Sequence, residues 1–113
     1  MTKRVNNSDM WRYTTDRQEF KNHNETAWGE WRDNLYIVYS YGQHFPMYVY
    51  DEQADRWYGN RDKFSRTTTR HQTNSQPEGV PIEWTDTKHL MAIILLGGII
   101  DYAVERLSTP EFA

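Results

Sequence analysis

Strand-forming residues are concentrated in one part of the chain, residues 35–50, with the sequence Leu35-Tyr36-Ile37-Val38-Tyr39-Ser40-Tyr41-Gly42-Gln43-His44-Phe45-Pro46-Met47-Tyr48-Val49-Tyr50. Residues 35–41 and 47–50 are β-branched and aromatic, which is typical of strands, and residues 42–46 have the composition of a turn. A second polar turn, residues 51–55, precedes Arg56-Trp57-Tyr58, a third short strand. These residues predict an antiparallel meander of three strands.

Side chains of the first predicted strand alternate between its two faces. One face carries Leu35, Ile37, Tyr39 and Tyr41, and the other carries Tyr36, Val38 and Ser40. Neither face is plainly polar, so we expect both faces of the sheet to be covered at least in part. The tyrosines of the meander then have two interpretations: they form an exposed binding platform, or about half of them fill the core.

A second apolar block follows Thr85-Asp86-Thr87, where Thr85 or Asp86 can act as the N-cap of a helix. The uncharged run from Leu90 to Ile100 is eleven residues long, shorter than the about 20 residues that span a bilayer, so we expect no membrane association. Gly97-Gly98 indicates close backbone packing at that point, a break in the helix or a simple kink. A helix that is apolar on all sides needs cover on more than one of them, so its spare face could bind a partner or form a homodimer.

Together these patterns predict an α+β fold in which a small antiparallel β-meander packs against a long C-terminal helix. The 113 residues fit a single domain. Within it we expect a flexible start at 1–10, a motif-bearing β region at 35–72 and the C-terminal helix at 86–108. The N-terminal segment would wrap over the sheet, with a short helix around Asp16 to Asn22.

Charge and composition exclude several classes of protein. Thirteen Lys and Arg against sixteen Asp and Glu give a net charge of -3, which excludes a polycation but allows a local basic patch. The absence of cysteine excludes disulfides, Cys-ligated metals and thiol catalysis. No apolar run follows the first residues, so we expect no signal peptide and a cytoplasmic location. A glycine-rich phosphate loop is also missing, which makes nucleotide hydrolysis an unexpected function.

Basic residues are concentrated between residues 56 and 72, where five of the thirteen Lys and Arg lie among three aromatic rings. Cations hold a phosphate backbone while rings stack on bases, as in single-strand-binding surfaces. The predicted nucleic-acid contacts are Arg56, Trp57, Arg61, Lys63, Phe64, Arg66, Arg70 and His71. The alternative is a solvated turn whose arginines pair with carboxylates or lie along rings, with Thr67-Thr68-Thr69 capping a short helix.

Histidines offer the remaining route to chemistry, because imidazole ligates metals and titrates near neutral pH. The four, His23, His44, His71 and His89, show no metal-motif spacing. His44 and His71 could meet at the ends of the meander and, with Asp51 or Asp62, form a hydrolytic metal site. The alternative is that His44 caps a turn and His71 bonds a backbone carbonyl. We expect no catalytic residue, no metal and no cofactor, and therefore a protein that is not an enzyme.

A set of spaced motifs runs through the middle of the chain: Tyr39-Ser40-Tyr41-Gly42-x-His44-Phe45-Pro46, Val49-Tyr50-Asp51, Trp57-Tyr58, Lys63-Phe64-Ser65-x-Thr67-Thr68 and Arg70-His71-Gln72. The set resembles a family of small uncharacterised proteins from bacteriophages and other prokaryotic mobile elements. The resemblance covers about residues 36–72. It implies a protein of the host-cell cytoplasm that acts in host takeover, in escape from host defence or in management of the element's own nucleic acid, all of which usually rely on binding.

Two functions from different classes remain open. The first is a non-enzymatic accessory protein that binds nucleic acid through the basic aromatic segment. The second is an inhibitor or adaptor that binds a host protein through the apolar helix, the tyrosine surface or the acidic remainder of the chain. The two differ in the surface they use, which the fold can locate.

Overall fold

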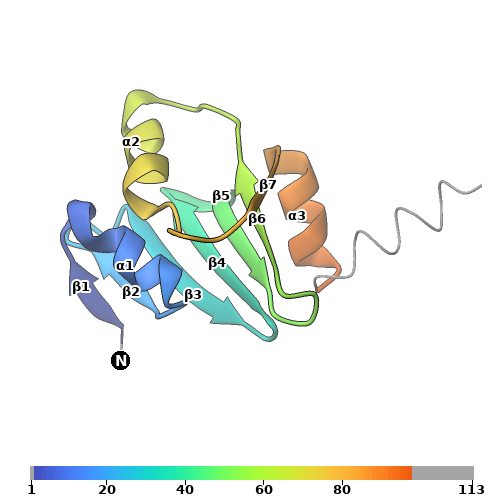
Figure 1. The fold of residues 1–113 in the computed structure, drawn as a ribbon. Helices are drawn as coiled ribbons and strands as arrows, with labels where there is room; N and C mark the ends of the chain where they lie inside the picture. Colours follow the sequence, from blue (N-terminus) through green and yellow to red (C-terminus); the bar gives the residue numbers. More distant parts are fainter. Residues whose placement is uncertain (1, 98–113) are drawn as a thin grey trace, which may run out of the picture.

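A seven-stranded mixed sheet with helices on both faces makes up the protein in the computed structural model, which describes residues 2–97 (Figure 1). The elements in chain order are β1 (Lys3–Val5), η1 (Asn7–Asp9), α1 (Met10–Thr15), β2 (Phe20–Asn22), β3 (Ala27–Arg32), β4 (Leu35–Ser40), β5 (Gly42–Asp51), β6 (Arg56–Asn60), α2 (Arg66–Ser75), β7 (Ile82–Thr85) and α3 (Thr87–Leu95). The predicted α+β class is confirmed. The three predicted strands are β4, β5 and β6, but they are the centre of a larger sheet and not the whole of it.

The order of strands in the sheet is the order in the chain, β1 to β7. The four inner pairings, from β2 to β6, are antiparallel, whereas β1 pairs with β2 and β6 pairs with β7 in parallel. The sheet is therefore mixed, which corrects the predicted all-antiparallel meander. Each parallel pair needs a crossover connection, and each crossover contains a helix, α1 or α2.

The two crossover helices lie over the same face of the sheet for a topological reason. Because β2 and β6 are separated by four antiparallel pairings, they run in the same direction. Each crossover leads to the next strand in the order from β1 to β7. Because crossovers between parallel strands are almost always right-handed, both crossover helices lie on the same face. Figure 1 shows α1 and α2 together on that face, with α3 packed on the other.

The connection between β4 and β5 is tighter than predicted. The chain turns at Tyr41, whose φ is 65°, and β5 already begins at Gly42, so residues 42–46 are strand and not turn. Opposite β4, Val38 faces Tyr48 and Tyr39 faces Pro46, which leaves Met47 as an extra residue. Such a bulge accommodates proline, which cannot donate to a regular ladder.

The N-terminal segment differs most from the prediction. A helix over Asp16 to Asn22 is wrong: α1 ends at Thr15, Arg17 has a φ of 54°, and Phe20–Asn22 is strand β2. Phe20 nevertheless points into the core and is fully buried. In the part expected to be flexible, residues 3–9 form β1 and η1, and the segment contributes three strands to the sheet instead of wrapping over it.

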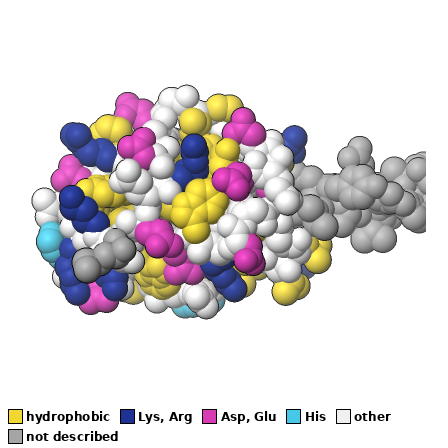
Figure 2. Space-filling view, turned by 90° about the horizontal axis from the view of Figure 1, so that it is seen from below, with side chains coloured by type: hydrophobic (Ala, Val, Ile, Leu, Met, Phe, Trp, Pro, Cys, Tyr) yellow, Lys and Arg dark blue, Asp and Glu magenta, His cyan; other side chains and the backbone are white. Residues whose placement is uncertain are grey.

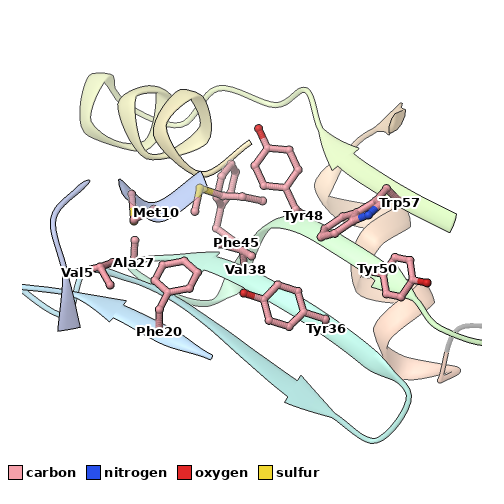
Figure 3. Packing of buried hydrophobic residues seen from close by; sticks show 11 residues of the cluster. Val5, Met10, Phe20, Ala27, Tyr36, Val38, Phe45, Tyr48, Tyr50 and Trp57 are labelled. Carbon is pink, nitrogen blue, oxygen red and sulfur yellow. The ribbon is translucent and has the colours of Figure 1, made fainter. Parts of the chain in front are cut away.

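Both faces of the sheet are buried, as the alternation predicted. The cluster on the α1 and α2 side consists of Val5, Met10, Phe20, Ala27, Tyr36, Val38, Phe45, Met47, Tyr48, Tyr50 and Trp57 (Figure 3). The cluster on the α3 side consists of Leu35, Ile37, Tyr39, Val49, Tyr58, Leu90 and Ile93. Of the six meander tyrosines, Tyr41 alone is exposed. The exposed tyrosine platform is therefore wrong, and the meander rings are core.

The C-terminal helix starts where predicted and is shorter. Asp86 is the N-cap and accepts from the backbone N–H of His89 at 2.8 Å. The helix ends at Leu95, and Gly97 has a φ of 67°, so of the three alternatives the structure has a break. Residues 98–108 of the predicted long helix lie outside the described residues. Within residues 2–97, no helix has both the length and the apolar character that crossing a membrane requires.

Candidate nucleic-acid interface

The connection from β6 to α2 carries the first basic residues of the predicted site. We call residues 61–65, Arg61-Asp62-Lys63-Phe64-Ser65, the basic loop; it crosses the top of Figure 1 in yellow-green, and all five residues are exposed. The buried Asn60 anchors its start. The Asn60 side-chain amide donates to Pro46 O at 2.8 Å and Thr87 Oγ1 at 2.9 Å, and its oxygen accepts from Asp62 N at 2.9 Å.

Gln72, on the buried face of α2, forms hydrogen bonds to the basic loop and to Asn60, the residue before it. The Gln72 side chain is 3% exposed, and its Nε2 donates to Asn60 O at 2.8 Å and to Asp62 O at 3.0 Å. Its Oε1 accepts from Lys63 Nζ at 3.2 Å. Both polar atoms of this buried amide are therefore hydrogen-bonded to Asn60 or to the basic loop. These bonds connect the loop to the hydrogen-bond network of the folded core.

The loop is also fixed to the far edge of the sheet and to the start of α3. The backbone N–H of Arg61 donates to Thr85 O at 2.8 Å, and the Asp62 carboxylate accepts from Thr87 N at 2.9 Å. The hydrogen bond from the Thr87 backbone lowers the pKa of the Asp62 carboxyl. Three elements, α2, β7 and α3, thus determine where Arg61 and Lys63 are presented.

Helix α2 continues the basic segment. Its N-cap is Ser65, whose hydroxyl accepts from Thr68 N at 3.1 Å, so the helix expected at the threonine run is confirmed but starts slightly earlier. Thr68, His71, Gln72 and Ser75 form its buried face. Arg66 and Arg70 are four residues apart and both are exposed on the solvent side.

Five of the eight predicted contacts come together around this connection. We call them the basic surface: Arg61, Lys63, Phe64, Arg66 and Arg70. The Phe64 ring is 71% exposed, and its inner edge lies against the buried Phe45 ring with a centroid distance of 6.0 Å. A ring with this much of its surface in solvent contributes little to the core and is accessible to another molecule.

The other three predicted contacts do not belong to this surface. Arg56 begins β6, at the opposite end of the strand from Asn60, and its guanidinium lies 3.9 Å from Glu83. Trp57 faces the core because strand alternation turns it inward, and His71 is on the buried face of α2 with 1% exposure. Both rings are buried and neither belongs to the basic surface, so the sequence-based assignment of both is corrected.

His71 joins α2 to the sheet through hydroxyl groups. Its Nδ1 is 2.8 Å from Ser40 Oγ, and its Nε2 is 3.5 Å from Thr26 Oγ1. The Ser40–His71 pair has the spacing of a nucleophile and its base, but both side chains are buried beneath α2, so a substrate cannot reach them. The pair therefore attaches the helix to β4, and no backbone carbonyl bond of the expected kind is involved.

Burial lowers the pKa of His71, with a smaller contribution from the positive charge of Arg70. The unfolded chain therefore binds a proton at this side chain more tightly than the folded protein does. The stabilisation by neutral His71 should be complete above about pH 6.5, the ordinary imidazole pKa, and be lost as the pH falls through the lower folded-state value. We expect the free energy of unfolding, measured in urea, to fall between pH 7.5 and 5.5.

The matched variants are His71→Gln and His44→Gln. His44 is an exposed histidine in β5, the strand that follows the His71 partner Ser40. Replacing His44 therefore disturbs no buried contact, and this variant should keep the pH dependence of the unmodified protein. His71→Gln should flatten the dependence even though its absolute stability is lower. An equal slope in the His71→Gln variant would show that other groups cause the loss of stability at low pH.

Most of the remaining motif residues are buried or make structural contacts in the described fold, whereas His44 and Thr67 are exposed. Tyr39 and Phe45 are buried, Pro46 accepts the Asn60 hydrogen bond, and Gly42 begins β5. Thr68 is buried on α2, whereas Thr67 is exposed. His44 is in solvent, and no cluster of three or more His, Cys, Asp or Glu side chains that could hold a metal occurs within residues 2–97.

One exposed ring beside the basic surface was missed by sequence reasoning. Trp84, in edge strand β7, is 45% exposed and packs on Tyr48 with a centroid distance of 6.1 Å. It also covers Gly59, at which a Cβ would come within 2.7 Å of the indole ring. The short segment Ile82-Glu83-Trp84-Thr85 has only two apolar residues, so nothing in it signalled a strand or a site.

The end of the sheet opposite the basic surface carries both acidic and basic side chains. A groove of about 630 Å³ there is lined by Arg17, Tyr50, Asp55, Arg56, Trp57, Val80, Pro81, Ile82 and Glu83. Its arginines are already engaged, because Arg17 lies over the Tyr50 ring at 4.5 Å and Arg56 lies beside Glu83. Figure 2, seen from below, shows Lys and Arg interspersed with Asp and Glu on that side. Mixed charge of this kind does not attract a polyanion.

The indication of function therefore comes from the residues of the basic surface and their geometry. The buried amides of Asn60 and Gln72 hold the backbone of the basic loop in a defined position. No protein-family model, no curated protein and no solved structure matches the chain.

Proposed function

We propose that the protein is a non-enzymatic, nucleic-acid-binding protein whose contact surface is the basic surface. The observation that carries the proposal is the exposure of four cations around a protruding ring on a connection that Asn60 and Gln72 hold in place. Phosphate contacts by Lys and Arg supply most of the affinity for nucleic acid, and a connection whose backbone is already held in place loses less entropy on binding.

The ion pairs of the protein favour this proposal over a solvated turn. Elsewhere basic side chains do have acidic partners: Arg4 lies 3.0 Å and Lys21 lies 3.3 Å from Glu25. Among the described residues, by contrast, no carboxylate lies within 4.0 Å of the charged groups of Arg61, Lys63, Arg66 or Arg70. Within residues 2–97, therefore, no carboxylate neutralises these four charges, and the Lys63 ammonium is bonded to the neutral Gln72 amide.

Replacing both α2 arginines by alanine, Arg66→Ala with Arg70→Ala, should weaken binding roughly tenfold at low salt, because two phosphate contacts are lost. The plot of log K against log salt should become shallower by about 1.5 to 2. Fluorescence anisotropy of labelled DNA and RNA at several salt concentrations measures both quantities. Neither side chain is buried, so the variant should stay folded.

The matched control is Arg32→Ala with Arg56→Ala, which removes the same charge from the other end of the sheet. Register places these arginines together, since Arg32 pairs with Leu35, Leu35 with Asp51, and Asp51 with Arg56. The control should bind nearly as well as the unmodified protein. Equal weakening in both variants would show only a net-charge effect, and no binding by the unmodified protein at low salt would refute the proposal.

A second candidate, binding of a protein partner, is favoured by the outer face of α3. Met91, Leu95 and Leu96 are exposed there, Leu95 to 83%. In the setting that the sequence resemblance implies, the partner would be a host protein; a second copy of this chain is the other occupant to test. A Leu95→Asp variant that loses a purified partner, or that halves the mass seen by light scattering, would support this candidate.

A further inference from the structure

We infer that the nucleic acid is single-stranded and that Phe64 and Trp84 are the two rings on which its bases stack. The inference rests on the proposed function and adds the class of ligand and a ring that lies 20 residues further along the chain. It is carried by two exposed aromatic rings that rest on rings of the same core cluster, with Lys63 next to Phe64 in the chain and the Arg61 backbone bonded to Thr85.

Phe64 and Trp84 are brought to one face by the rings beneath them. Phe64 packs on Phe45, and Trp84 packs on Tyr48. Both supporting rings belong to the core cluster on the α2 side, because the extra residue Met47 resets the alternation of β5 between them. Two neighbouring positions of one strand therefore each support an outward-facing ring.

Arg61 and Lys63 lie in the connection that joins these rings. The backbone of Arg61 is bonded to Thr85, the residue after Trp84, and Lys63 directly precedes Phe64. A basic residue is thus adjacent to each ring, along the chain at Phe64 and across the strand edge at Trp84. A single strand carries the complementary pattern, because a negatively charged phosphate accompanies every base.

The rings discriminate against a duplex for a simple physical reason. In a double helix the faces of the bases are covered by their neighbours, and a protein meets phosphates and groove edges. Exposed rings gain nothing from such a surface, whereas unstacked bases can cover them and remove their apolar area from water. Loss of the rings should therefore affect single strands much more than duplexes.

The test compares four labelled 12-nucleotide probes by anisotropy: oligo-dT, oligo-U, a mixed-sequence duplex and an abasic strand that keeps its phosphates and lacks bases. The unmodified protein should bind oligo-dT or oligo-U at least about tenfold more tightly than the abasic strand and the duplex. The ratio between oligo-dT and oligo-U identifies DNA or RNA as the preferred form.

Phe64→Ala and Trp84→Ala should each cost about tenfold on the preferred strand and nothing on the abasic strand. Trp84→Leu keeps an apolar side chain over Gly59, so it should fold even if Trp84→Ala does not. Leu95→Ala, on the opposite face, is the matched control and should bind normally. Thermal unfolding of each variant confirms that it is folded at the temperature of the assay.

Two outcomes would overturn the inference and leave the proposed function standing. One is equal binding of the abasic strand and oligo-dT, which would mean that phosphate contacts alone hold the ligand. The other is a preference for the duplex, which would indicate that Arg66 and Arg70 present α2 to a groove. Absence of binding to all four probes at low salt would instead refute the proposed function itself.

Discussion

Gln72→Glu should lower the free energy of unfolding by about 4 kcal/mol at neutral pH. The substitution keeps the size of the side chain and removes its N–H donors, so the carbonyls of Asn60 and Asp62 lose their partner and face a carboxylate instead. The Lys63 ammonium, 3.2 Å from Oε1, offsets this loss only in part because Lys63 is exposed to solvent. Each unsatisfied buried group costs about 1–3 kcal/mol. Urea unfolding monitored by circular dichroism measures the change.

Gln43→Glu is the control for this substitution, because it introduces the same charge at an exposed position in β5. Its free energy of unfolding should stay within about 0.5 kcal/mol of the original. If Gln72→Glu proved equally mild, the buried network beneath the basic loop would contribute little, and the loop would have to be held by its other contacts. In the Gln72→Glu variant, lowering the pH until the new carboxyl is protonated should restore part of the lost stability.

Gly29→Ala should also destabilise the protein, by roughly 2–3 kcal/mol. Gly29 pairs with Phe20 across β2 and β3, and a Cβ at position 29 would come within 2.7 Å of the Phe20 ring and would collide with the Tyr36 hydroxyl. Neither can move easily, since both rings are fully buried and the hydroxyl donates to Gln18 O at 2.6 Å. The midpoint of thermal unfolding reports the loss.

Gly42→Ala is the control that separates the effect of crowding from the effect of replacing a glycine. A Cβ at Gly42 would meet only the His44 ring, at 2.6 Å, and that side chain is exposed and can swing away. Gly42→Ala should therefore cost less than about 1 kcal/mol. Similar losses in the two variants would mean that the space around Gly29 adapts, contrary to the packing described above.

The centre of the fold was predictable because its signal is local. Residues 35–58 are rich in β-branched and aromatic side chains, and Asp86 has the chemistry of an N-cap. Strands β2 and β7 carry no such signal. Phe20-Lys21-Asn22 and Ile82-Glu83-Trp84-Thr85 become strands because partners on the neighbouring strand complete their hydrogen bonds, which is a tertiary effect that local propensity does not contain.

The candidate site was predictable in part for the same reason. The concentration of Arg61, Lys63, Arg66 and Arg70 is visible in the sequence, but the inward direction of Trp57 depends on which face of β6 is covered. The direction of His71 depends on which side of α2 meets Ser40. Trp84 was missed because the chain between it and Phe64 is long and gives no sign that β7 returns beside β6.

The sequential order of the seven strands has a consequence for how the molecule is made. From β2 onward each strand pairs with the one synthesised just before it, so every new strand finds its template already present. The strands from β3 to β6 close only short loops, whereas β2 and β7 arrive after crossovers that contain α1 and α2. The sheet can grow from one edge as the chain emerges from the ribosome. Because β7 and the start of α3 fasten Arg61 and Asp62, the basic loop is secured only after the rest of the sheet has been assembled.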